Sequence, residues 1–508
     1  MSPSHVVHRE FWGTPDVHLK RSKTVVLMKG NKKATRGLML EKISVIGIGK
    51  LGAPMAACFA AKGFDVVAVD VDVRKIDAIN RGESPIFEPR VEEMMASAKG
   101  RLSATQDLEA AVLATTITFV VVATPSEADG SFSLRHVLPV CEKIGSSLRK
   151  KNGFHLVVLT STVMPGSTGG EVRATLERSS GLHAGREFGL CYNPEFIALG
   201  SVVRNFLNPD FLLIGESDEC SGKILEGIYK RVCDNKPPAS RLTFVDAEIA
   251  KLAVNTFVTT KISFANMLAR ICERVPGSSV DAVTGALGMD SRIGPRYLKG
   301  AISYGGPCFP RDNIALASLA KRVGSPADIA QATDSFNRGQ IRWLADLVQR
   351  CLSDCGTAGI LGLTYKPNTD VVEEAPGWVL AQELTSRGVS VVAFDPAAVH
   401  TSNVFPSRVE FASTATECIA KSDVVAIATP WAEFANIKST KWARCPLART
   451  VVDCWREFSF LERVDGVNYV PLGTGAILPR APRPPELASV PEAPKEPVVQ
   501  SLGEGGAD

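Results

Sequence analysis

A short loop around Cys308 has the composition expected of a reactive thiol. Residues 305–312 read GGPCFPRD, so glycines free the backbone before the cysteine and prolines stiffen it on both sides. Arg311 and Asp312 follow at once and make the surroundings polar. A nucleophilic thiol needs an accessible, rigid and polar setting, whereas a structural cysteine is a small buried hydrophobe. We therefore predict a covalent role for Cys308 and burial for the other cysteines.

Further candidate groups lie upstream. From Asp246 to residue 274 the sequence contains no Gly or Pro, which predicts one long helix with Asp246 as its N-cap. Lys251 and Asn255 are four residues apart on this helix, so they project from one face and are either a solvated stripe or parts of a site. Glu195 lies in CYNPEFIALG, a Pro-interrupted turn after an apolar strand; taken alone, it is a surface carboxylate.

A dinucleotide site is indicated at the first strand–helix unit. Gly47, Gly49 and Gly52 form GxGxxG directly after the apolar run KISVIGI, where glycines allow a tight turn and close approach of backbone N–H groups to a pyrophosphate. Asp70 ends the next strand, and a carboxylate there binds a ribose 2′-OH and repels a 2′-phosphate. Lys75, one helical turn further on, offers some counter-charge to a 2′-phosphate. On balance the pattern predicts NAD as the cofactor.

The elements that must position these groups are short strands alternating with helices. Near-continuous β-branched runs separated by helical stretches predict parallel sheets covered on both faces. Thr124 and Thr162 end two of these runs, and the carboxyl ends of parallel strands are where such sheets bind ligands. The runs form two sets, 42–48, 65–71, 117–124 and 155–162, then 358–365, 389–396, 423–430 and 450–455.

We therefore predict an α/β protein in which two Rossmann-like doubly wound parallel-sheet domains are joined by a central helical domain that contains the long helix. The last residues are rich in proline and should be disordered. The expected divisions are a flexible basic extension over 1–40, the cofactor domain over 41–235, the helical domain with the Cys308 loop over 236–340, the second Rossmann-like domain over 341–478 and the Pro-rich tail over 479–508.

The composition excludes several classes of protein. With 57 Lys and Arg against 54 Asp and Glu among 508 residues, the net charge of +3 gives no general attraction to nucleic acid or anionic lipid. The 12 cysteines include no CxxC pair and have no companion His cluster, so we expect neither a disulfide framework nor a metal site. No apolar run approaches the roughly 20 residues of a membrane span. We expect a cytoplasmic protein whose natural start is Met1 or Met39.

Together, these motifs resemble the UDP-glucose/GDP-mannose dehydrogenase family from about residue 42 to 460. GIGKLGAPMA, STV, NPEF, the helix segment with Lys251 and Asn255, GGPCFPRD and GLTYKPNTD occur in the family's order and approximate spacing. The resemblance implies an NAD domain, a central domain used for dimerisation and a third domain that binds the nucleotide sugar, in a homodimer or larger homo-oligomer. It also implies a four-electron oxidation of the sugar's C6 alcohol through an aldehyde to a carboxylate, with two NAD⁺ consumed.

The resemblance also implies roles for single residues. Cys308 adds to the aldehyde, the thiohemiacetal loses a second hydride, and the resulting thioester is hydrolysed. Lys251 stabilises the oxyanion. Asp312 positions or deprotonates the water, and Glu195 assists the hydrolysis.

Other positions are implied as contacts of the substrate. Asn255 and Thr162 help to hold the oxyanion or an ordered water. The preferred substrate is UDP-glucose, with a UDP-N-acetylhexosamine next and GDP-mannose third. The residues expected at the nucleotide sugar are Glu195, Lys251, Asn255, Tyr297, Leu298, Lys299, Gly305, Lys366 and Arg292, the last of which reaches the neighbouring subunit's site in the family.

Three departures from the family pattern concern the substrate more than the reaction type. Leu199 replaces a second glutamate, residues 371–374 read VVEE in place of an Asp-x-Arg-Glu pattern, and Arg456 in DCWREF does not align clearly with the family's late sugar-binding arginine. Two other functions remain open. One is a two-electron β-hydroxyacid dehydrogenase, which needs neither Cys308 nor a third domain, and the other is a non-catalytic protein that binds NAD or a nucleotide sugar.

Overall fold

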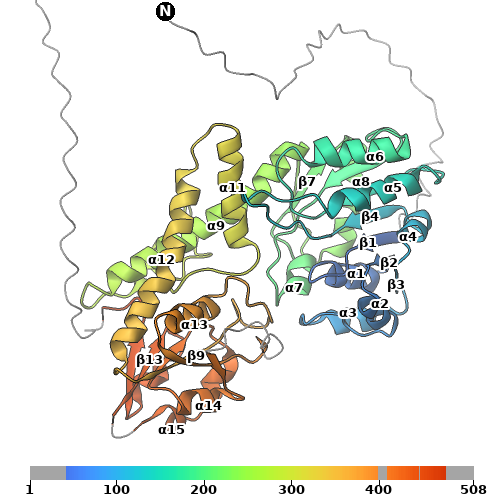
Figure 1. The fold of residues 1–508 in the computed structure, drawn as a ribbon. Coiled ribbons are helices and arrows are strands. Elements are labelled where there is room, and N and C mark those ends of the chain that lie inside the picture. Colours follow the sequence, from blue (N-terminus) through green and yellow to red (C-terminus); the bar gives the residue numbers. More distant parts are fainter. Residues whose placement is uncertain (1–41, 399–408, 445–446, 476–508) are drawn as a thin grey trace, which may run out of the picture. The chain divides into compact units, whose positions relative to one another are not determined.

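The computed structural model describes residues 42–398, 409–444 and 447–475. Within these residues the strands form an eight-stranded and a six-stranded sheet, and a group of helices lies between the two sheets along the chain (Figure 1). The predicted fold class is therefore confirmed. The predicted N-terminal extension over 1–40 and the predicted tail over 479–508 lie outside the described residues.

The first sheet has the strand order β3-β2-β1-β4-β5-β6-β7-β8. The strands from β3 to β6 are parallel, whereas β7 is antiparallel to β6. The chain order reverses between β1 and β4, so the crevice at their carboxyl ends is where such a sheet binds its ligand. The strands are β1 (Lys42–Ile46), β2 (Asp65–Val69), β3 (Leu102–Thr105), β4 (Ile117–Val120), β5 (Leu156–Leu159), β6 (Gly189–Tyr192), β7 (Leu212–Glu216) and β8 (Ala239–Leu242).

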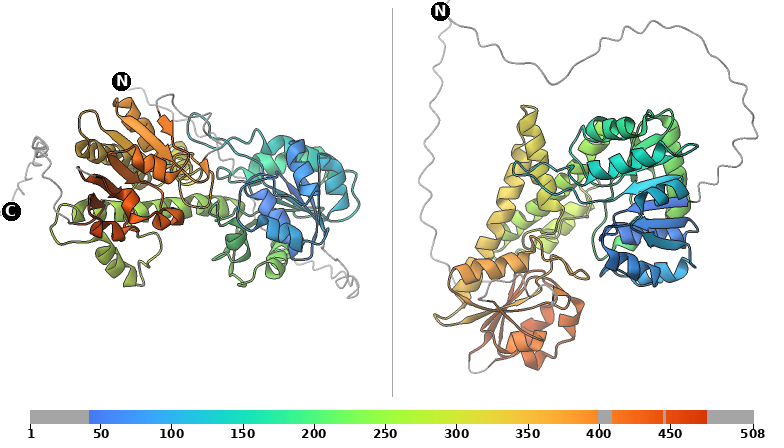
Figure 2. Two further views of the ribbon diagram at one scale, coloured as in Figure 1. Left: turned by 90° about the horizontal axis from the view of Figure 1, so that it is seen from below. Right: turned by 45° about the vertical axis from the view of Figure 1, so that its right-hand side comes forward.

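Helices cover both faces of this sheet (Figure 2). Successive strand residues point to opposite faces, so Phe119 and Val120 of β4 are buried in different layers. Phe119 packs against Phe59 of α1, with ring centroids 4.9 Å apart, whereas Val120 belongs to the core under α4, α5 and α6. The helices are α1 (Gly52–Ala61), α2 (Val73–Asn80), α3 (Val91–Ser97), α4 (Leu108–Ala114), α5 (Val137–Leu148), α6 (Arg173–Ser180), α7 (Val202–Leu207) and α8 (Glu219–Val232), with a π-helical turn at Thr168–Val172.

The second sheet repeats the topology of the first six strands. Its order is β11-β10-β9-β12-β13-β14, and all its strand pairs are parallel. The strands are β9 (Thr357–Leu361), β10 (Ser390–Phe394), β11 (Val409–Phe411), β12 (Val424–Ile427), β13 (Arg449–Asp453) and β14 (Val467–Pro471). The associated helices are α13 (Pro376–Ser386), α14 (Ala415–Ala420) and α15 (Ser439–Trp442), with 3₁₀ turns at Ala432–Asn436 and Ser459–Arg463.

The central helices are α9 (Phe244–Cys272), α10 (Val280–Met289), α11 (Phe309–Arg322) and α12 (Asp328–Cys351). The predicted long helix is α9, but the prediction of Asp246 as its N-cap is wrong. Thr243 has the extended backbone of an N-cap, and its Oγ1 accepts the backbone N–H of Asp246 at 3.2 Å. Asp246 instead lies in the first turn, where its carboxylate accepts a hydrogen bond from the Thr243 hydroxyl. Its negative charge there interacts favourably with the positive end of the helix dipole. The predicted domain boundary at residue 340 falls inside α12.

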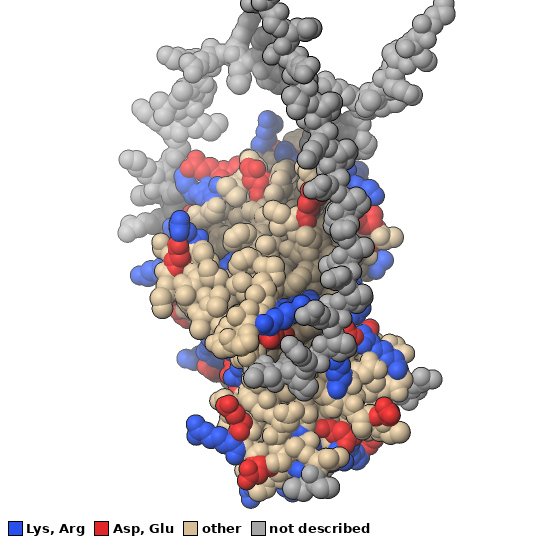
Figure 3. Space-filling view, turned by 90° about the vertical axis from the view of Figure 1, so that its left-hand side faces the viewer, with Lys and Arg blue, Asp and Glu red and all other residues tan. Residues whose placement is uncertain are grey.

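Charged side chains of both signs are interspersed on the surface. Figure 3 shows this mixture on one face, as expected for nearly balanced acidic and basic residues. Among the residues that the structure describes, no helix combines the length and apolar character needed to cross a membrane.

Candidate active site

The glycine-rich turn after β1 leaves room for a ligand at one position and is tightly packed at two others. Gly47 has φ +101°, and a Cβ on it would lie 2.5 Å from the carbonyl oxygen of Val121. A Cβ on Gly52 would lie 1.8 Å from the carbonyl oxygen of Gly47, so α1 can start only if this residue is glycine. A Cβ on Gly49 would meet nothing within 4 Å. The turn is therefore closed on the protein side and open at Gly49, as a pyrophosphate site requires.

Asp70 at the end of β2 faces this turn. Its Oδ2 accepts the backbone N–H of Ile48 at 2.7 Å, and its Oδ1 accepts the backbone N–H of Asp72 at 3.0 Å. Lys75 Nζ lies 3.5 Å from Oδ2, so the carboxylate already partners the cation that could have favoured a 2′-phosphate. Asp70 is therefore held at the turn by the Ile48 N–H, at the strand end where a carboxylate can bind a ribose hydroxyl.

Two threonines at strand ends connect the first sheet to the Cys308 loop. Thr124 Oγ1 donates to the carbonyl oxygen of Thr162 at 2.7 Å, which brings the ends of β4 and β5 together. The Arg311 guanidinium donates to the Thr124 carbonyl and, at 3.0 Å, to the Ser126 hydroxyl. Arg311 also lies over the Phe132 ring, with its central carbon 4.8 Å from the centroid. Arg311, three residues after Cys308, thus forms hydrogen bonds to the edge of the first sheet where the cofactor is predicted to bind.

Cys308 is the N-cap of α11. Its side chain is exposed, yet enough protein surrounds the thiol that desolvation raises its pKa. The positive charge of Lys251 acts in the opposite direction, and a helix N-terminus also favours a thiolate. The thiol is therefore accessible, as predicted, and is desolvated next to a cation.

A buried polar group links α9 to α11 beside this thiol. Asn255 Nδ2 donates to Asp312 Oδ2 at 2.6 Å, and both residues are buried. Burial raises the pKa of the Asp312 carboxyl, against the charge of Lys251 and the hydrogen bond from Asn255. Lys251 Nζ donates to the carbonyl oxygen of Glu195 at 2.9 Å and lies 4.6 Å from the Phe196 ring centroid. The long helix therefore does present both predicted side chains to one buried polar cluster.

Glu195 completes this cluster from the turn after β6. Its Oε1 accepts a hydrogen bond from the Tyr229 hydroxyl of α8 at 2.8 Å. Burial of the carboxyl raises the pKa of Glu195 to about 7, although the hydrogen bond from Tyr229 and the charge of Lys251 lower it. A carboxyl that is half protonated near neutral pH can either give or accept a proton.

The GLTYKPNTD motif of the second sheet meets the turn that carries Glu195. A Cβ on Gly200 would lie 2.5 Å from the carbonyl oxygen of Asn368, and one on Gly306 would lie 2.8 Å from the Tyr365 ring. Gly305 is equally constrained, because its Cβ would lie 2.0 Å from the Glu374 carbonyl oxygen. Lys366 next to this contact is partly desolvated, which lowers its pKa, and Glu88 opposes that effect. The glycines before Cys308 are thus needed for close packing.

Three models of one family match the chain: the NAD binding domain of the UDP-glucose/GDP-mannose dehydrogenase family over residues 41–233, the family's central domain over 245–339 and its UDP binding domain over 359–459. The chain belongs to this family. NAD is therefore the cofactor of the first sheet, and the open position at Gly49 together with Asp70 fits it.

Individual relatives agree with the family models over most of the chain. A UDP-glucose 6-dehydrogenase of Haloferax volcanii is 35% identical over 432 residues, which cover 84% of this chain and 99% of the relative. A GDP-mannose 6-dehydrogenase of Pseudomonas syringae pv. tomato is also 35% identical, over 376 residues that cover 73% of this chain and 83% of the relative. The solved UDP-glucose dehydrogenase of Pyrobaculum islandicum superposes with a TM-score of 0.78 at 32% identity, covering 87% of this chain and 99% of that one.

Four of the positions implied by the family resemblance show no hydrogen bond to the cluster around Lys251. The Arg292 side chain is exposed and bonds Asp290, with Nη2 to Oδ2 at 2.6 Å. Tyr297 is half exposed, Leu298 is buried, and Lys299 forms an ion pair with Glu457. The substrate-binding roles of these four residues stay predictions, because the contacts that the structure gives them are with other described residues of this chain.

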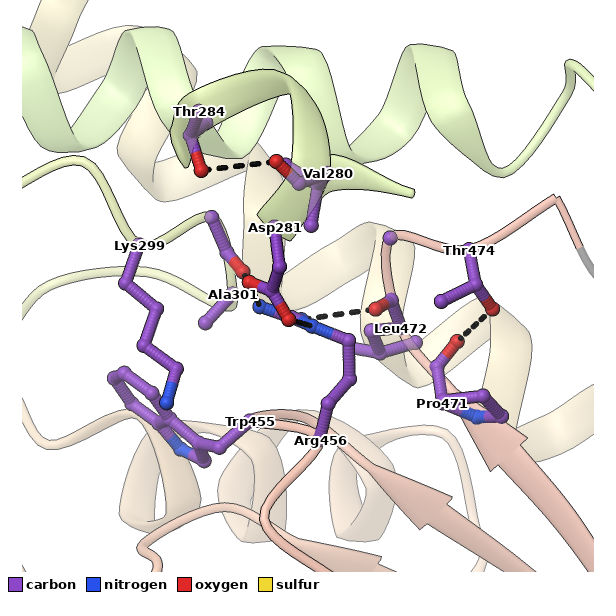
Figure 4. Close-up of polar contacts among 12 residues, drawn as sticks. Val280, Asp281, Thr284, Lys299, Ala301, Trp455, Arg456, Pro471, Leu472 and Thr474 are labelled. Atoms are coloured by element: carbon purple, nitrogen blue, oxygen red, sulfur yellow. Dashed lines mark hydrogen bonds and ion pairs between the residues drawn. The ribbon is translucent and has the colours of Figure 1, made fainter. Parts of the chain in front are cut away.

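Arg456 has a structural role in this family member (Figure 4). Its Nε and Nη2 bond both carboxylate oxygens of Asp281 at 2.8 Å, and its remaining bonds go to the carbonyl oxygens of Gly300 at 2.6 Å and Leu472 at 2.9 Å. The side chain is only 7% exposed. Since the guanidinium has five N–H donors and four of them are used inside the chain, Arg456 is a clamp between α10 and the second sheet.

Several residues of the site could not be recognised in the sequence. Tyr229 lies on the buried face of α8, where a tyrosine in an apolar pattern gives no signal. Glu248 is one turn before Lys251 on α9 and is fully buried, and its carboxylate accepts the backbone N–H groups of Gly166 at 2.6 Å and Thr168 at 2.8 Å. The sequence signal that could have identified Glu248 is an acidic residue among apolar neighbours, one helical turn from Lys251.

The prediction of burial for the other cysteines is wrong at Cys220 and Cys355, which are exposed, and Cys351 is only half-buried. Cys445 lies outside the described residues. Cys220 lies in the first turn of α8, and Cys355 lies in the turn after α12. Neither has the glycine-rich loop and the neighbouring cation of Cys308. The buried cysteines are Cys58, Cys141, Cys191, Cys233, Cys272, Cys418 and Cys454.

Proposed function

We propose that this dehydrogenase oxidises the C6 hydroxymethyl group of a nucleotide sugar to a carboxylate, with UDP-glucose as the preferred substrate and Cys308 as the covalent nucleophile. The overall change is R–CH₂OH + 2 NAD⁺ + H₂O → R–COO⁻ + 2 NADH + 3 H⁺. The observation that carries the proposal is a thiol at the start of α11 with the Lys251 cation beside it and the Asn255–Asp312 pair one turn away.

Bound NAD⁺ supplies the hydride acceptor for each of the two oxidations. Asp70 would bind the adenosine ribose, and the Gly49 end of the turn would receive the pyrophosphate. Thr124 and Thr162 follow the carboxyl ends of β4 and β5, and ligands of such sheets bind outside the carboxyl ends of the strands. The two threonines would therefore lie beside the nicotinamide end of the cofactor.

Cys308 makes the second oxidation possible. An aldehyde has no hydride to lose until a nucleophile has added to its carbon. When the Cys308 sulfur adds, the C=O bond becomes an alkoxide that Lys251 can stabilise by charge. Loss of the second hydride then re-forms the C=O bond and leaves a thioester on the sulfur.

Hydrolysis of the thioester releases the product. A water oxygen bonds to the acyl carbon, the C–S bond breaks, and the sulfur leaves with the bonding electron pair. Asp312 would take the proton of the water, since Asn255 holds its carboxylate at 2.6 Å and the first turn of α11 places it near the sulfur. Glu195 would assist as the second carboxyl of the cluster.

The choice of sugar and base rests on sequence similarity. A UDP-glucose 6-dehydrogenase and a GDP-mannose 6-dehydrogenase are both 35% identical to this chain, but the first covers 84% of it and the second 73%. The larger coverage and the matched UDP binding domain support a UDP-sugar, and the presence of this third domain supports a nucleotide sugar over the substrate of a β-hydroxyacid dehydrogenase. A UDP-N-acetylhexosamine is the alternative, since Leu199 removes one carboxylate from the turn that carries Glu195.

We also propose that the protein acts as a homodimer formed through α9. One face of this helix exposes apolar side chains seven, three and four residues apart, and Phe257 is 66% exposed. An apolar stripe at helical spacing on the surface marks an interaction site. The other members of the stripe are Phe264, Met267 and Ile271.

The test is the number of NADH molecules formed per sugar. We expect UDP-glucose to give two NADH with the unaltered enzyme and to react faster than UDP-N-acetylglucosamine or GDP-mannose. Cys308→Ser should stop after the aldehyde or an ester-linked stage, with about one NADH per sugar in a single turnover, because a serine hydroxyl is a far weaker nucleophile near neutral pH.

Cys355→Ser is the matched control, because Cys355 is also exposed but lies outside the site. It should retain two NADH per sugar. Two NADH from Cys308→Ser would contradict the nucleophile assignment. Binding of the nucleotide sugar with no NADH from any substrate would instead identify a non-catalytic protein.

A further inference from the structure

The hydroxyl of Tyr229 lies between two acceptors. Its oxygen is 2.5 Å from Asn193 Oδ1 and 2.8 Å from Glu195 Oε1. A phenol has one proton, so it can donate to only one of these oxygens at a time. Tyr229 and Asn193 are each 1% exposed, so water cannot replace the missing donor cheaply.

The orientation of the Asn193 amide is determined by its other partner. Asn193 Nδ2 donates to the carbonyl oxygen of Leu213 at 3.0 Å, and the Asn193 backbone N–H donates to Leu159 at 2.8 Å. Turning the amide over would place its oxygen against the Leu213 carbonyl and its NH₂ against the tyrosine. Asn193 Oδ1 therefore faces Tyr229 as a permanent acceptor.

We propose that Asn193 and Glu195 compete for the hydroxyl proton of Tyr229, and that this competition sets how readily Glu195 holds its own proton. This rests on the proposed function only in giving Glu195 a part in the reaction. Tyr229 and Asn193 are positioning residues, since they act through the Glu195 carboxyl.

The two states of Glu195 use the hydroxyl differently. When Glu195 is protonated, its O–H donates to the Tyr229 oxygen, and the Tyr229 hydroxyl donates to Asn193, so every group is satisfied. When Glu195 is ionised, Tyr229 must turn its proton toward the carboxylate, and Asn193 Oδ1 loses its donor. Asn193 therefore favours the protonated carboxyl, whereas the Tyr229 hydroxyl supports the ionised one.

The charges around Glu195 leave room for this control. From α9, Lys251 donates to the backbone oxygen of Glu195 at 2.9 Å and acts on the carboxyl only through its charge. Just after α8, the Cys233 thiol also interacts with Glu195, but burial raises the pKa of this thiol to about 12, so it stays neutral. Since burial brings the pKa of Glu195 to about 7, one hydrogen bond decides its state near neutral pH.

The proposal predicts opposite shifts for two variants. Asn193→Leu frees the hydroxyl proton for Glu195 and should lower the midpoint of the Glu195 titration by about 0.7 pH unit, the worth of one ordinary hydrogen bond. Tyr229→Phe removes the carboxylate's hydroxyl donor and should raise the midpoint. With Phe at position 229 there is no proton to compete for, so adding Asn193→Leu should cause no further shift.

The measurement is infrared difference spectroscopy of the unliganded full-length enzyme as a function of pH. The C=O band of protonated Glu195 is assigned by its loss in Glu195→Gln. Tyr469→Phe is a matched control, because Tyr469 bonds the Asp453 carboxylate at 2.8 Å in the second sheet, and it should leave the Glu195 midpoint unchanged. No nucleotide or sugar is present, so the result is independent of whether the proposed oxidation occurs.

Shifts in the same direction, or no shift with Asn193→Leu, would overturn the competition. If Asn193→Leu does not fold, Asn193→Ala removes the same acceptor with a smaller side chain and must also lower the midpoint. As a second readout, the pH dependence of kcat with UDP-glucose should move with the infrared midpoint, whereas a merely structural effect of either variant would lower kcat equally at all pH values.

Discussion

Replacing Arg456 by leucine tests whether this arginine is a clamp or a ligand for the substrate. The change keeps apolar bulk and removes the guanidinium that bonds Asp281, Gly300 and Leu472. The two carbonyl oxygens lose donors in a largely buried place, at about 1–3 kcal/mol each. The ion pair adds little, about 0–1 kcal/mol, because the Asp281 side chain is 50% exposed. We expect a loss of about 3 kcal/mol in the free energy of unfolding.

Urea unfolding followed by tryptophan fluorescence measures this loss. Trp455 is a suitable probe because it precedes Arg456 and its Nε1 donates to the Ala428 carbonyl at 2.7 Å. Asp281→Asn is the control, since it removes only the charge of a half-exposed partner and should cost less than about 1 kcal/mol. If Arg456→Leu unfolds like the unaltered protein while KM for the nucleotide sugar rises, Arg456 binds substrate and the clamp is refuted.

Three other variants test the cofactor, the thiol and the dimer. Asp70→Ala should reduce the ratio of kcat/KM with NAD⁺ to kcat/KM with NADP⁺ by about tenfold, which is the effect of losing one hydrogen bond to a charged group. Equal kcat/KM values with the two cofactors in the unaltered enzyme would contradict the role of Asp70. Lys251→Met should slow alkylation of Cys308 at neutral pH, because loss of the cation raises the pKa of the thiol further. Alkylation of the exposed Cys220 is the internal reference. An unchanged rate of Cys308 alkylation would show that Lys251 does not act on the thiol. Phe264→Glu should convert the dimer to monomer in sedimentation, whereas Leu447→Glu, also at an exposed apolar residue, should not; a monomeric unaltered enzyme would exclude the dimer.

The sheets could be predicted from the sequence because their strands carry their own signal. Parallel strands buried on both faces read as β-branched runs, and each of the eight predicted runs overlaps a strand of the structure. Some of the strands that escaped prediction, such as β3 (LSAT) and β8 (ASRL), are short and mix polar with apolar residues. Their pairing is decided by neighbouring strands, which a local pattern does not report.

The site could be predicted only where the chemistry demands an unusual residue. Cys308 stands between glycines and prolines, and Lys251 interrupts an apolar helix, so both are visible in the sequence. Tyr229 looks like an ordinary core residue, and Asn193, although it begins the NPEF motif, gives no sign in the sequence of its hydrogen bond to a residue 36 positions away. Arg456 shows the reverse case, since its contacts and not its residue type decide that it is a clamp.

Lys251 acts on all three acids of this site, and Arg311 acts on two of them. Burial raises the pKa values of Cys308, Asp312 and Glu195, while Lys251 lowers each of them and Arg311 lowers those of Cys308 and Asp312. With fewer cations than acids in a desolvated site, each additional anion is costly. The proposed steps never need two of these acids ionised at once. The thiolate is needed when sulfur adds to the aldehyde, whereas a carboxylate base is needed when water attacks the thioester, and at that stage the sulfur is bonded to carbon and carries no charge. Lys251 should therefore matter in every step, and each acid chiefly in one.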